Sequence, residues 1–252
     1  MFKATLQDVS VLKDSFDAVS SMISEGTFEV GKEGLKLVAM DPASVAMVIF
    51  RILPSAFLDY TCKEETNMTI SIANLVTILR RARANDQVTF ELDSNKLKIN
   101  MAGDFKRSFV LPLIDSAVVQ QKIPELSFKS KIVLSAGALK DGIKDAQMVS
   151  DCVILEAGQT SFIIKSFGDT SETRMELTKD SPSLAGLQMI GDDGKMVKSK
   201  YAIEYLDKML KGTKVSDNIA LQFANNYPVR LDYTIVDKLQ LSFILAPRVD
   251  TD

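Results

Sequence analysis

Side chains that could do chemistry are few in this sequence, and none has the spacing of a familiar catalytic arrangement. The chain has no histidine, which removes the commonest general base and the Ser-His-Asp and Cys-His arrangements that activate a nucleophile. Cys62 and Cys152 have no C-x-x-C partner, so we expect neither a disulfide nor a zinc site, and we expect both thiols to be buried. Chemistry would have to depend on carboxylates, lysine or a bound metal.

Two acidic segments are the remaining candidates for a metal or phosphate site. Asp192 with Asp193, or Asp169 with Glu172, could offer carboxylates, but no second cluster completes a two-metal geometry. Residues 191–195 (GDDGK) superficially resemble a phosphate loop, yet the spacing is wrong and no Ser or Thr follows the lysine. We therefore expect a protein that is not an enzyme and uses no cofactor or metal.

Composition and charge set the broad class. With 252 residues, 46% of them hydrophobic, the chain can form one large core or two smaller ones. Its longest apolar run, residues 45–50, is far too short for a membrane helix, and the start resembles no signal peptide, so we expect a soluble intracellular protein. The net charge of −3 argues weakly against nucleic-acid binding, unless the basic residues are clustered.

The chain contains an internal repeat. Residues 11–40 and 138–167 both begin with an L-K-D helical pattern, close it with a serine followed by an acidic residue, and continue with two strand-like runs around a turn. Apolar residues three and four apart predict helices within 9–22 and 137–149, and similar patterns predict helices within 72–84 and 200–212. Each half therefore holds two helices.

Alternating apolar residues predict more strands than helices, and short turns predict antiparallel pairing. The clearest strands are 88–92, 97–101, 219–223 and 239–243. The fold class is α+β, duplicated, with helices packed on one face of the sheet. We expect domains at 1–114 and 131–252, joined by a connecting loop at 115–130, and a long loop at 179–199.

Basic residues are concentrated in the four helical windows. These windows contain nine Lys or Arg against six Asp or Glu, so the rest of the chain is acidic. Ordinary solvated helix faces would explain one such helix, but the cluster Arg80, Arg81 and Arg83 suggests a surface that faces an anionic polymer. Since no aromatic residues are interleaved, that polymer would be duplex nucleic acid bound through its phosphates.

Several motifs make the sequence resemble the PCNA-type DNA sliding clamps of archaea and eukaryotes along essentially its whole length. They are residues 40–48 (MDPASVAMV), 111–115 (LPLID), 123–126 (IPEL), 139–151 and 245–249 (LAPRV). The first and last are more similar to archaeal members.

The resemblance implies a DNA clamp fold and a closed ring of three self-associating subunits, whose helices line a hole for duplex DNA. It implies a polymerase processivity factor with the replicative DNA polymerase, clamp loader, flap endonuclease and DNA ligase as partners, and no membrane. The expected location is the cytoplasm, associated with the nucleoid, or the nucleus if the source is eukaryotic. The alternative is a checkpoint-type clamp, or one subunit of a heterotrimeric clamp, acting mainly as a protein-binding scaffold.

The resemblance also assigns residues to three surfaces. The expected DNA-binding residues are Lys13, Arg80, Lys140, Lys144, Lys208, Lys211 and Lys214. A hydrophobic pocket for a partner's short motif is expected from Met40, Ser44, Val45, Met47, Ile123, Pro228, Ile244, Ala246 and Pro247, with backbone pairing at Arg248 and Val249. Contacts between subunits are expected from strands 106–113 and 172–179, with Arg81, Arg83, Arg107, Phe109, Asp141, Asp145, Arg174 and Glu176.

Two features of this chain modify these expectations. Asp14, Asp17 and Ser20 make the first helix less basic than in some members of the family, which suggests a weak grip on DNA. Arg81 and Arg83 could serve either the DNA channel or the contact between subunits, and we favour the contact between subunits for both.

Overall fold

The computed structural model describes residues 1–115, 121–191 and 195–248, and the chain divides into two compact units. The first unit comprises Met1–Ile123 and Thr234–Leu241, and the second comprises Pro124–Tyr233 and Ser242–Asp252. The division after Ile123 falls inside the segment 115–130. In the part of the chain that the structure describes, no helix is long and apolar enough to cross a membrane.

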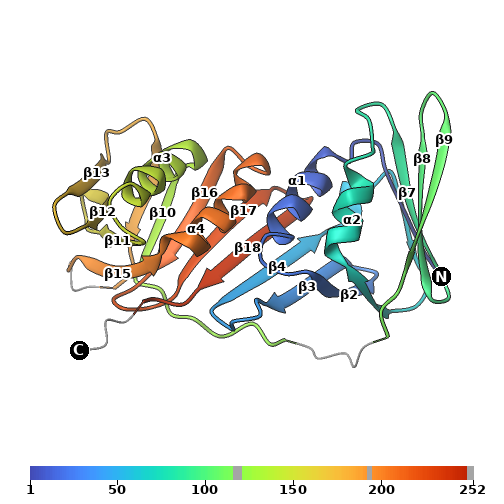
Figure 1. Ribbon diagram of the computed structural model, residues 1–252, viewed down its shortest axis with the longest axis horizontal. Coiled ribbons are helices and arrows are strands. Elements are labelled where there is room, and N and C mark those ends of the chain that lie inside the picture. The colour runs from blue at the N-terminus through green and yellow to red at the C-terminus, as the bar shows by residue number, and fades with distance from the viewer. Residues whose placement is uncertain (116–120, 192–194, 249–252) are drawn as a thin grey trace. The chain divides into compact units, whose positions relative to one another are not determined.

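The first unit has two antiparallel sheets and two helices (Figure 1). Its elements are β1 (Phe2–Leu6), α1 (Ser10–Val19), β2 (Glu25–Gly31), β3 (Gly34–Met40), β4 (Ala46–Ile52), the 3-10 turn η1 (Pro54–Ala56), β5 (Asp59–Cys62), β6 (Thr66–Ser71), α2 (Ile72–Leu79), β7 (Gln87–Asp93), β8 (Lys96–Ala102) and β9 (Lys106–Pro112). One sheet has the order β5-β1-β7-β8-β9, and β4-β3-β2-β6 lie side by side in the other.

The second unit repeats this plan. Its elements are β10 (Ser130–Ser135), α3 (Ala136–Gln147), β11 (Cys152–Ala157), β12 (Ser161–Phe167), β13 (Glu172–Thr178), β14 (Leu184–Met189), β15 (Val197–Ala202), α4 (Ile203–Met209), the 3-10 turn η2 (Leu210–Lys214), β16 (Asn218–Phe223) and most of β17 (Val229–Ile235) and β18 (Leu239–Leu245), since Thr234–Leu241 belong to the first unit. Their orders are β14-β10-β16-β17-β18 and β13-β12-β11-β15. Each order is that of the first unit with every strand number raised by nine, which confirms the duplication.

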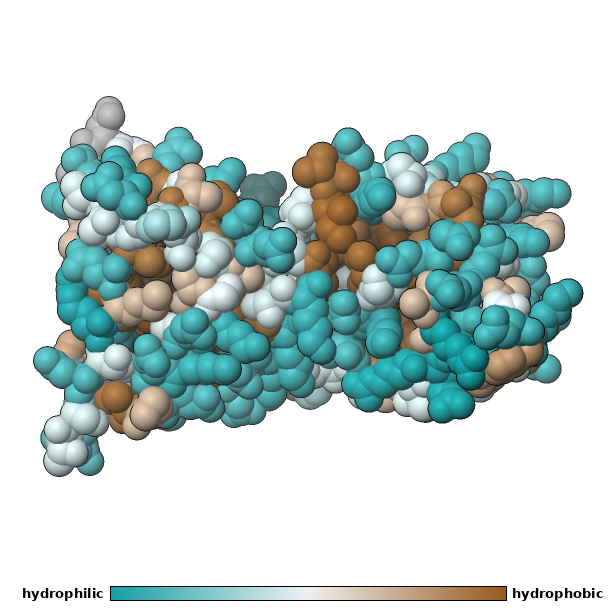
Figure 2. All heavy atoms as spheres, turned by 90° about the horizontal axis from the view of Figure 1, so that it is seen from above, coloured by the Kyte–Doolittle hydropathy of each residue, from teal (hydrophilic) through white to brown (hydrophobic). Residues whose placement is uncertain are grey.

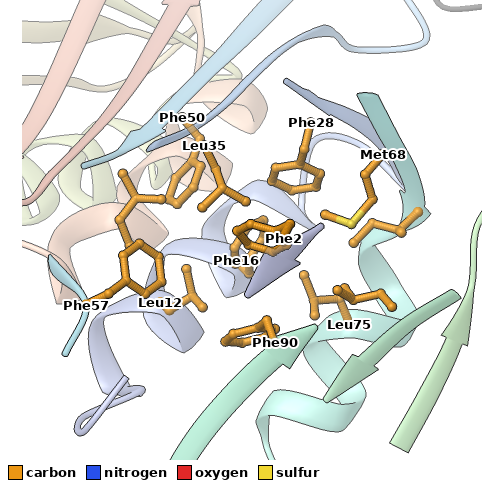
Figure 3. Close-up of a pocket in the computed structure, with 13 residues that line it drawn as sticks. Phe2, Leu12, Phe16, Phe28, Leu35, Phe50, Phe57, Met68, Leu75 and Phe90 are labelled. Atoms are coloured by element: carbon orange, nitrogen blue, oxygen red, sulfur yellow. The ribbon is translucent and has the colours of Figure 1, made fainter. Parts of the chain in front are cut away.

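Helix α1 shows how the apolar pattern forms the core of the first unit. Its buried face includes Leu12 and Phe16, and the Phe16 ring lies 5.7 Å from Phe28 and 5.0 Å from Phe50, both on the sheet. Figure 3 shows these side chains pointing toward one another around a cavity of about 40 Å³. Since its lining is apolar and its volume suits little more than one water, the cavity is a packing defect of the core.

Tight turns fix the hairpins that the sequence predicts. Gly34, after the β2–β3 turn, has φ +110°, and a Cβ there would lie 2.0 Å from the Ile52 carbonyl oxygen. Both the conformation and the close approach require glycine. The β7–β8 turn places Ser94 at φ 52°.

Some predicted boundaries were wrong. The fourth helix begins at Ile203, because Lys200 and Tyr201 pair with β11. The second helix, in contrast, lies within its predicted window and ends at Leu79, so the arginines that follow Arg80 lie beyond it. The segment 179–199 contains β14 and the first residues of β15, and is therefore not one long loop.

The expectation that both thiols are buried is correct for only one cysteine. Cys152 is buried, whereas Cys62 is partly exposed, since β5 lies at the end of its sheet order.

Candidate nucleic-acid interface and partner surfaces

The expected DNA-binding residues all lie on or directly after helices. In the first unit, Lys13 is on α1 and Arg80 caps the C-terminus of α2. In the second unit, Lys140 and Lys144 are one turn apart on α3, Lys208 is on α4, and Lys211 and Lys214 are on η2. Lys13 and Lys208 are half-exposed and the others are exposed, so their charges are available to solvent ions or to phosphate.

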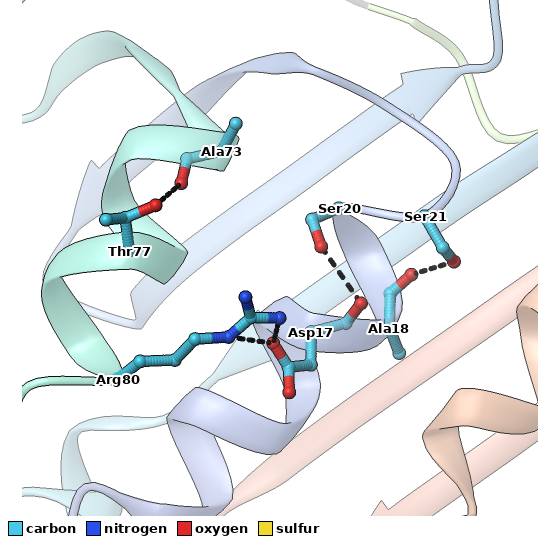
Figure 4. Close-up of polar contacts among 7 residues, drawn as sticks. All are labelled: Asp17, Ala18, Ser20, Ser21, Ala73, Thr77 and Arg80. Atoms are coloured by element: carbon cyan, nitrogen blue, oxygen red, sulfur yellow. Dashed lines mark hydrogen bonds and ion pairs between the residues drawn. The ribbon is translucent and has the colours of Figure 1, made fainter.

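Arg80 is already paired with an acid. Its Nε and Nη2 atoms donate to the same Asp17 carboxylate oxygen, at 3.1 and 2.7 Å (Figure 4). Asp17 belongs to α1, and its side chain is 19% exposed against 60% for Arg80. The acid is thus held at the helix surface while the guanidinium lies over it, which halves the free positive charge expected in this unit.

Lys208 is also partly engaged. Its Nζ lies 2.6 Å from a carboxylate oxygen of Glu204, one turn earlier on α4, and 5.0 Å from the centroid of the Tyr205 ring. Such exposed pairs contribute little stability and exchange easily, so Lys208 can still meet another anion.

The two strands expected between subunits are both end strands. Among the described residues, β9 pairs with β8 alone and β13 pairs with β12 alone, so each has one unpaired edge. Both strands have the same pattern over seven positions, in which exposed residues alternate with two half-buried residues and then a buried leucine. Each presents backbone N–H and C=O groups along one edge, which is the form that another strand can pair with.

The arginines near β9 form a local network that also holds Phe105. Arg107 is ion-paired with the buried Asp86, whose carboxylate also accepts a hydrogen bond from the Arg83 backbone N–H at 2.8 Å. Arg107 donates to the Arg81 carbonyl oxygen at 2.7 Å. The guanidinium carbons of Arg83 and Arg107 lie 4.8 and 5.2 Å from the centroid of the Phe105 ring.

The four expected subunit contacts in and near this network have different environments. Arg83 makes a 3.6 Å ion pair with Asp104, and both side chains are highly exposed, so the pair is weak. Arg107 Nε is buried and has no hydrogen-bond partner among the described residues. Phe109 is half-buried on β9, and the Arg81 residue is exposed. No sequence pattern pointed to Asp86 or Phe105, because their roles depend on contacts across the turn before β9.

The expected contacts in the second unit are exposed. Asp141 and Asp145 lie one turn apart on α3. Arg174 and Glu176 are two residues apart on β13, with 2.7 Å between Nη2 and the carboxylate. Hydrogen bonds from Ser161 and then Arg174 lower the pKa of Glu176, so this acid stays charged at neutral pH.

Asp41 organises the loop that carries part of the expected partner pocket. Its buried carboxylate accepts hydrogen bonds from the backbone N–H groups of Val45 and Ala46, both at 2.7 Å, and of Ala43 at 3.1 Å. Ser44 has φ 57° within this loop. Asp41 was missed as a functional residue, although an Asp side chain in a turn typically accepts a hydrogen bond from the backbone N–H two residues further on.

The expected pocket residues come from both units and are described unit by unit. In the first unit, Met40 and Val45 are half-exposed, Ser44 and Ile123 are exposed, and Met47 is buried. In the second unit, Ile244 is buried, Pro228 and Pro247 are half-exposed, and Ala246 is exposed. Their assembly into one pocket stays a prediction.

The C-terminal segment is tied to the second unit through Arg248. Its backbone N–H donates to the Lys200 carbonyl oxygen at 2.7 Å, and its Nη1 lies 2.7 Å from Asp151 and 2.9 Å from the Cys152 sulfur. The hydrogen bond from Arg248 lowers the pKa of Asp151, whereas burial, then Asp151, raises the pKa of the Cys152 thiol. Val249, expected to continue this segment, lies outside the described residues.

The remaining surface features are exposed apolar residues and acidic side chains. The face in Figure 2 is mostly hydrophilic, with separate hydrophobic patches, and exposed apolar residues in the described chain include Leu58, Val110 and Val236. No group of three Cys, Asp or Glu residues within the described ranges could hold a metal ion. Asp192 and Asp193 lie outside those ranges.

Known proteins share the sequence and the fold over almost the whole chain. Residues 1–108 match the N-terminal domain, and residues 122–248 the C-terminal domain, of proliferating cell nuclear antigen. The DNA polymerase sliding clamp of Nanoarchaeum equitans is 37% identical, over 98% of this chain and 100% of that protein. DNA polymerase sliding clamp 1 of Thermococcus kodakarensis is 35% identical, over 99% of each chain.

Solved structures agree. PCNA from Thermococcus kodakaraensis superposes with a TM-score of 0.92 at 28% identity, covering 98% of this chain and 100% of that one. The PCNA2–PCNA3 complex from Sulfolobus tokodaii contains a chain of the same fold, with a TM-score of 0.88 at 22% identity and coverage of 98% and 100%. With both domains matched and relatives more than 30% identical over their full length, the chain belongs to the proliferating cell nuclear antigen family of sliding clamps.

Proposed function

We propose that this chain is the subunit of a DNA polymerase sliding clamp, in which three copies close into a ring around duplex DNA and hold a DNA polymerase on it. The observation that carries the proposal is the duplication of topology, in which each unit has two helices with basic side chains on them or directly after them. Membership of the sliding-clamp family supports it independently. The clamp acts by retention on DNA and not by a reaction of its own.

The helices would contact the DNA through phosphates. Lysine and arginine side chains on regular helices give charge without a pattern that could read bases. The proposed contacts are Lys13, Arg80, Lys140, Lys144, Lys208, Lys211 and Lys214. Because a closed ring cannot fall off a long duplex, affinity can be low, which allows movement along the DNA.

The ring would close by pairing β9 of one copy with β13 of the next. Pairing satisfies the exposed edges of both strands and removes the aggregation hazard of leaving them open. Arg81 and Arg83 would then reach Asp141 and Asp145 of the neighbouring copy. The exposed Arg83–Asp104 pair can be exchanged for such a contact at small cost, since exposed pairs are worth about 0–1 kcal/mol.

Light scattering after size-exclusion chromatography tests the ring directly. At micromolar concentration, a mass near three times 27.8 kDa supports a ring of identical chains. A monomer at all concentrations would contradict it and favour a clamp built with other subunits. Arg83→Glu should weaken the assembly more at low salt than at high salt, whereas Lys32→Glu, an exposed cation in the β2–β3 turn, should not.

Partner proteins would dock through a short peptide motif. The proposed pocket consists of the residues that the resemblance assigns to it, and the segment at Arg248 would offer backbone groups to the peptide. The proposed partners at this pocket are the replicative DNA polymerase, the clamp loader, the flap endonuclease and DNA ligase. The clamp would therefore be located with the nucleoid in the cytoplasm.

Calorimetric titration with a motif peptide tests the pocket. A peptide with aliphatic and aromatic anchors should bind, and the same peptide with its anchors changed to alanine should not. Val45→Ala should weaken binding, whereas Leu58→Ala, at an apolar residue 61% exposed elsewhere in the first unit, should leave it unchanged. Equal effects of the two variants would place the pocket elsewhere.

A further inference from the structure

The pair between Arg80 and Asp17 lies where the proposed function requires a free cation. Arg80 is one of two expected DNA contacts in the first unit, and two of its nitrogens donate to one Asp17 oxygen. Figure 4 shows the guanidinium reaching from the end of α2 to the side of α1. A carboxylate oxygen and a phosphate oxygen are equivalent partners for a guanidinium, so Asp17 occupies the position that a DNA phosphate would take.

The helices of the two units differ in net charge, and the Arg80–Asp17 pair lies in the unit whose helical charges cancel. Helices α1 and α2 with the cap residue of α2 carry Lys13, Asp14, Asp17 and Arg80, which cancel. Helix α3 with α4 and η2 carries five lysines against four acids, and Lys140, Lys144, Lys211 and Lys214 are exposed. The net positive charge of the helices is therefore confined to the second unit.

The geometry also shows which member of the pair can move. The Asp17 side chain is 19% exposed on α1, while the Arg80 side chain is 60% exposed. An exposed ion pair of this kind is weak, so Arg80 can leave it for a phosphate. When Arg80 leaves, its ion pair with Asp17 is lost, and this loss offsets part of the gain from the new phosphate contact.

We infer that Asp17 is an internal competitor of DNA phosphate for Arg80, which lowers the affinity of the clamp for duplex DNA and leaves most of the grip to the second unit. The inference rests on the proposed function, because it presumes that these helices face DNA. Asp17 acts through Arg80 and is a positioning residue, not a DNA contact. Its effect is to weaken a grip that a sliding ring must repeatedly release.

Salt-dependent binding of a short fluorescent duplex, measured by anisotropy on the assembled protein, tests the inference. Asp17→Ala should bind about fivefold more tightly near 0.1 M salt, because Arg80 no longer has to give up an ion pair whose strength is about that of two opposite charges 4 Å apart in water. The slope of log affinity against log salt should steepen by about 0.9, the value for one added phosphate contact. Asp17→Asn, which keeps the size and one hydrogen-bond acceptor, should fall between Asp17→Ala and the unchanged protein.

Two further variants separate a specific competitor from a general charge effect. Asp207→Ala removes the same charge from an exposed position on α4 and should change affinity less than twofold. In an Arg80→Ala background, Asp17→Ala should give no increase beyond that of Asp207→Ala. A full fivefold gain in that background, or equal gains from Asp17→Ala and Asp207→Ala, would overturn the inference.

The same data distinguish failure of the inference from failure of the proposed function. If the unchanged protein binds duplex with a salt-dependent affinity and Asp17→Ala matches it, only the inference fails. If no variant binds duplex at any salt while the assembly mass stays intact, the DNA-encircling function fails with it. Unfolding curves followed by circular dichroism should show that every variant is folded.

Discussion

Replacing Asp41 by alanine should both destabilise the first unit and impair partner binding. The substitution removes an acceptor that serves three backbone N–H groups, of which that of Ala46 is buried. One buried donor without a partner costs about 1–3 kcal/mol, and the other two, which water can reach, lose about 0.5–1 kcal/mol each. We expect a total loss of about 3 kcal/mol.

Thermal unfolding gives the first readout. A loss of this size lowers Tm by about 6–12 °C in a chain of this length, when protein concentration is held constant. Asp41→Asn keeps one acceptor oxygen and should lose about half as much. Asp59→Ala, at an exposed residue on β5, is the matched control and should leave Tm within about 1 °C, as surface substitutions usually do.

Peptide binding gives the second readout. The loop that Asp41 holds carries Ser44 at positive φ and Val45, both expected in the partner pocket. When the loop relaxes, calorimetry should show weaker binding of the anchor peptide at a temperature where the variant is fully folded. If Asp41→Ala unfolds at the same temperature as Asp59→Ala, the carboxylate does not organise the loop and the reasoning is refuted.

Two further predictions concern Gly212 and the ion pair between Arg248 and Asp151. A Cβ at Gly212 would lie 2.6 Å from the buried Tyr233 ring, so Gly212→Ala should lose about 1–3 kcal/mol by overpacking in chemical denaturation, whereas Gly137→Ala, with nothing within 4 Å, should be neutral or stabilising. Arg248 lowers the pKa of Asp151, so their ion pair should be present at and above the ordinary aspartate pKa near 3.9 and be lost as pH falls through the lowered pKa. Carbon-detected NMR of the Asp151 carboxyl should show this acidic titration. Asp151→Asn should accelerate tryptic cleavage after Arg248 at pH 8, and an unchanged rate would mean that the ion pair does not hold the segment.

Local patterns in the sequence were sufficient for the elements that repeat. The spacing of Leu12 and Phe16 predicts the buried face of α1, and Asp93 to Lys96 predicts the β7–β8 turn, because both depend on neighbours within a few residues. The start of the fourth helix was wrong because Tyr201 is apolar in either pattern. Only its pairing with Val153, far away in the sequence, shows that it belongs to a strand.

The candidate site was harder to predict because its important contacts join distant residues. Arg80 and Asp17 are 63 positions apart, and their pairing depends on how α1 and α2 pack. Arg107 was expected between subunits, but its ion pair with Asp86 requires the turn before β9 to bring the two together. A residue type and a helix position therefore indicate charge, while the partner that neutralises it comes from tertiary structure.

Because Cys152 lies beneath Arg248, the reactivity of its thiol reports how often the C-terminal segment opens. The thiol is 5% exposed and its sulfur is covered by the guanidinium at 2.9 Å, so a reagent can reach it only when the segment lifts away. With Cys62 changed to serine, one thiol remains, and its alkylation rate reports how often the segment opens. A docked partner that binds the open segment would raise the alkylation rate of Cys152, and one that holds the segment closed would lower it.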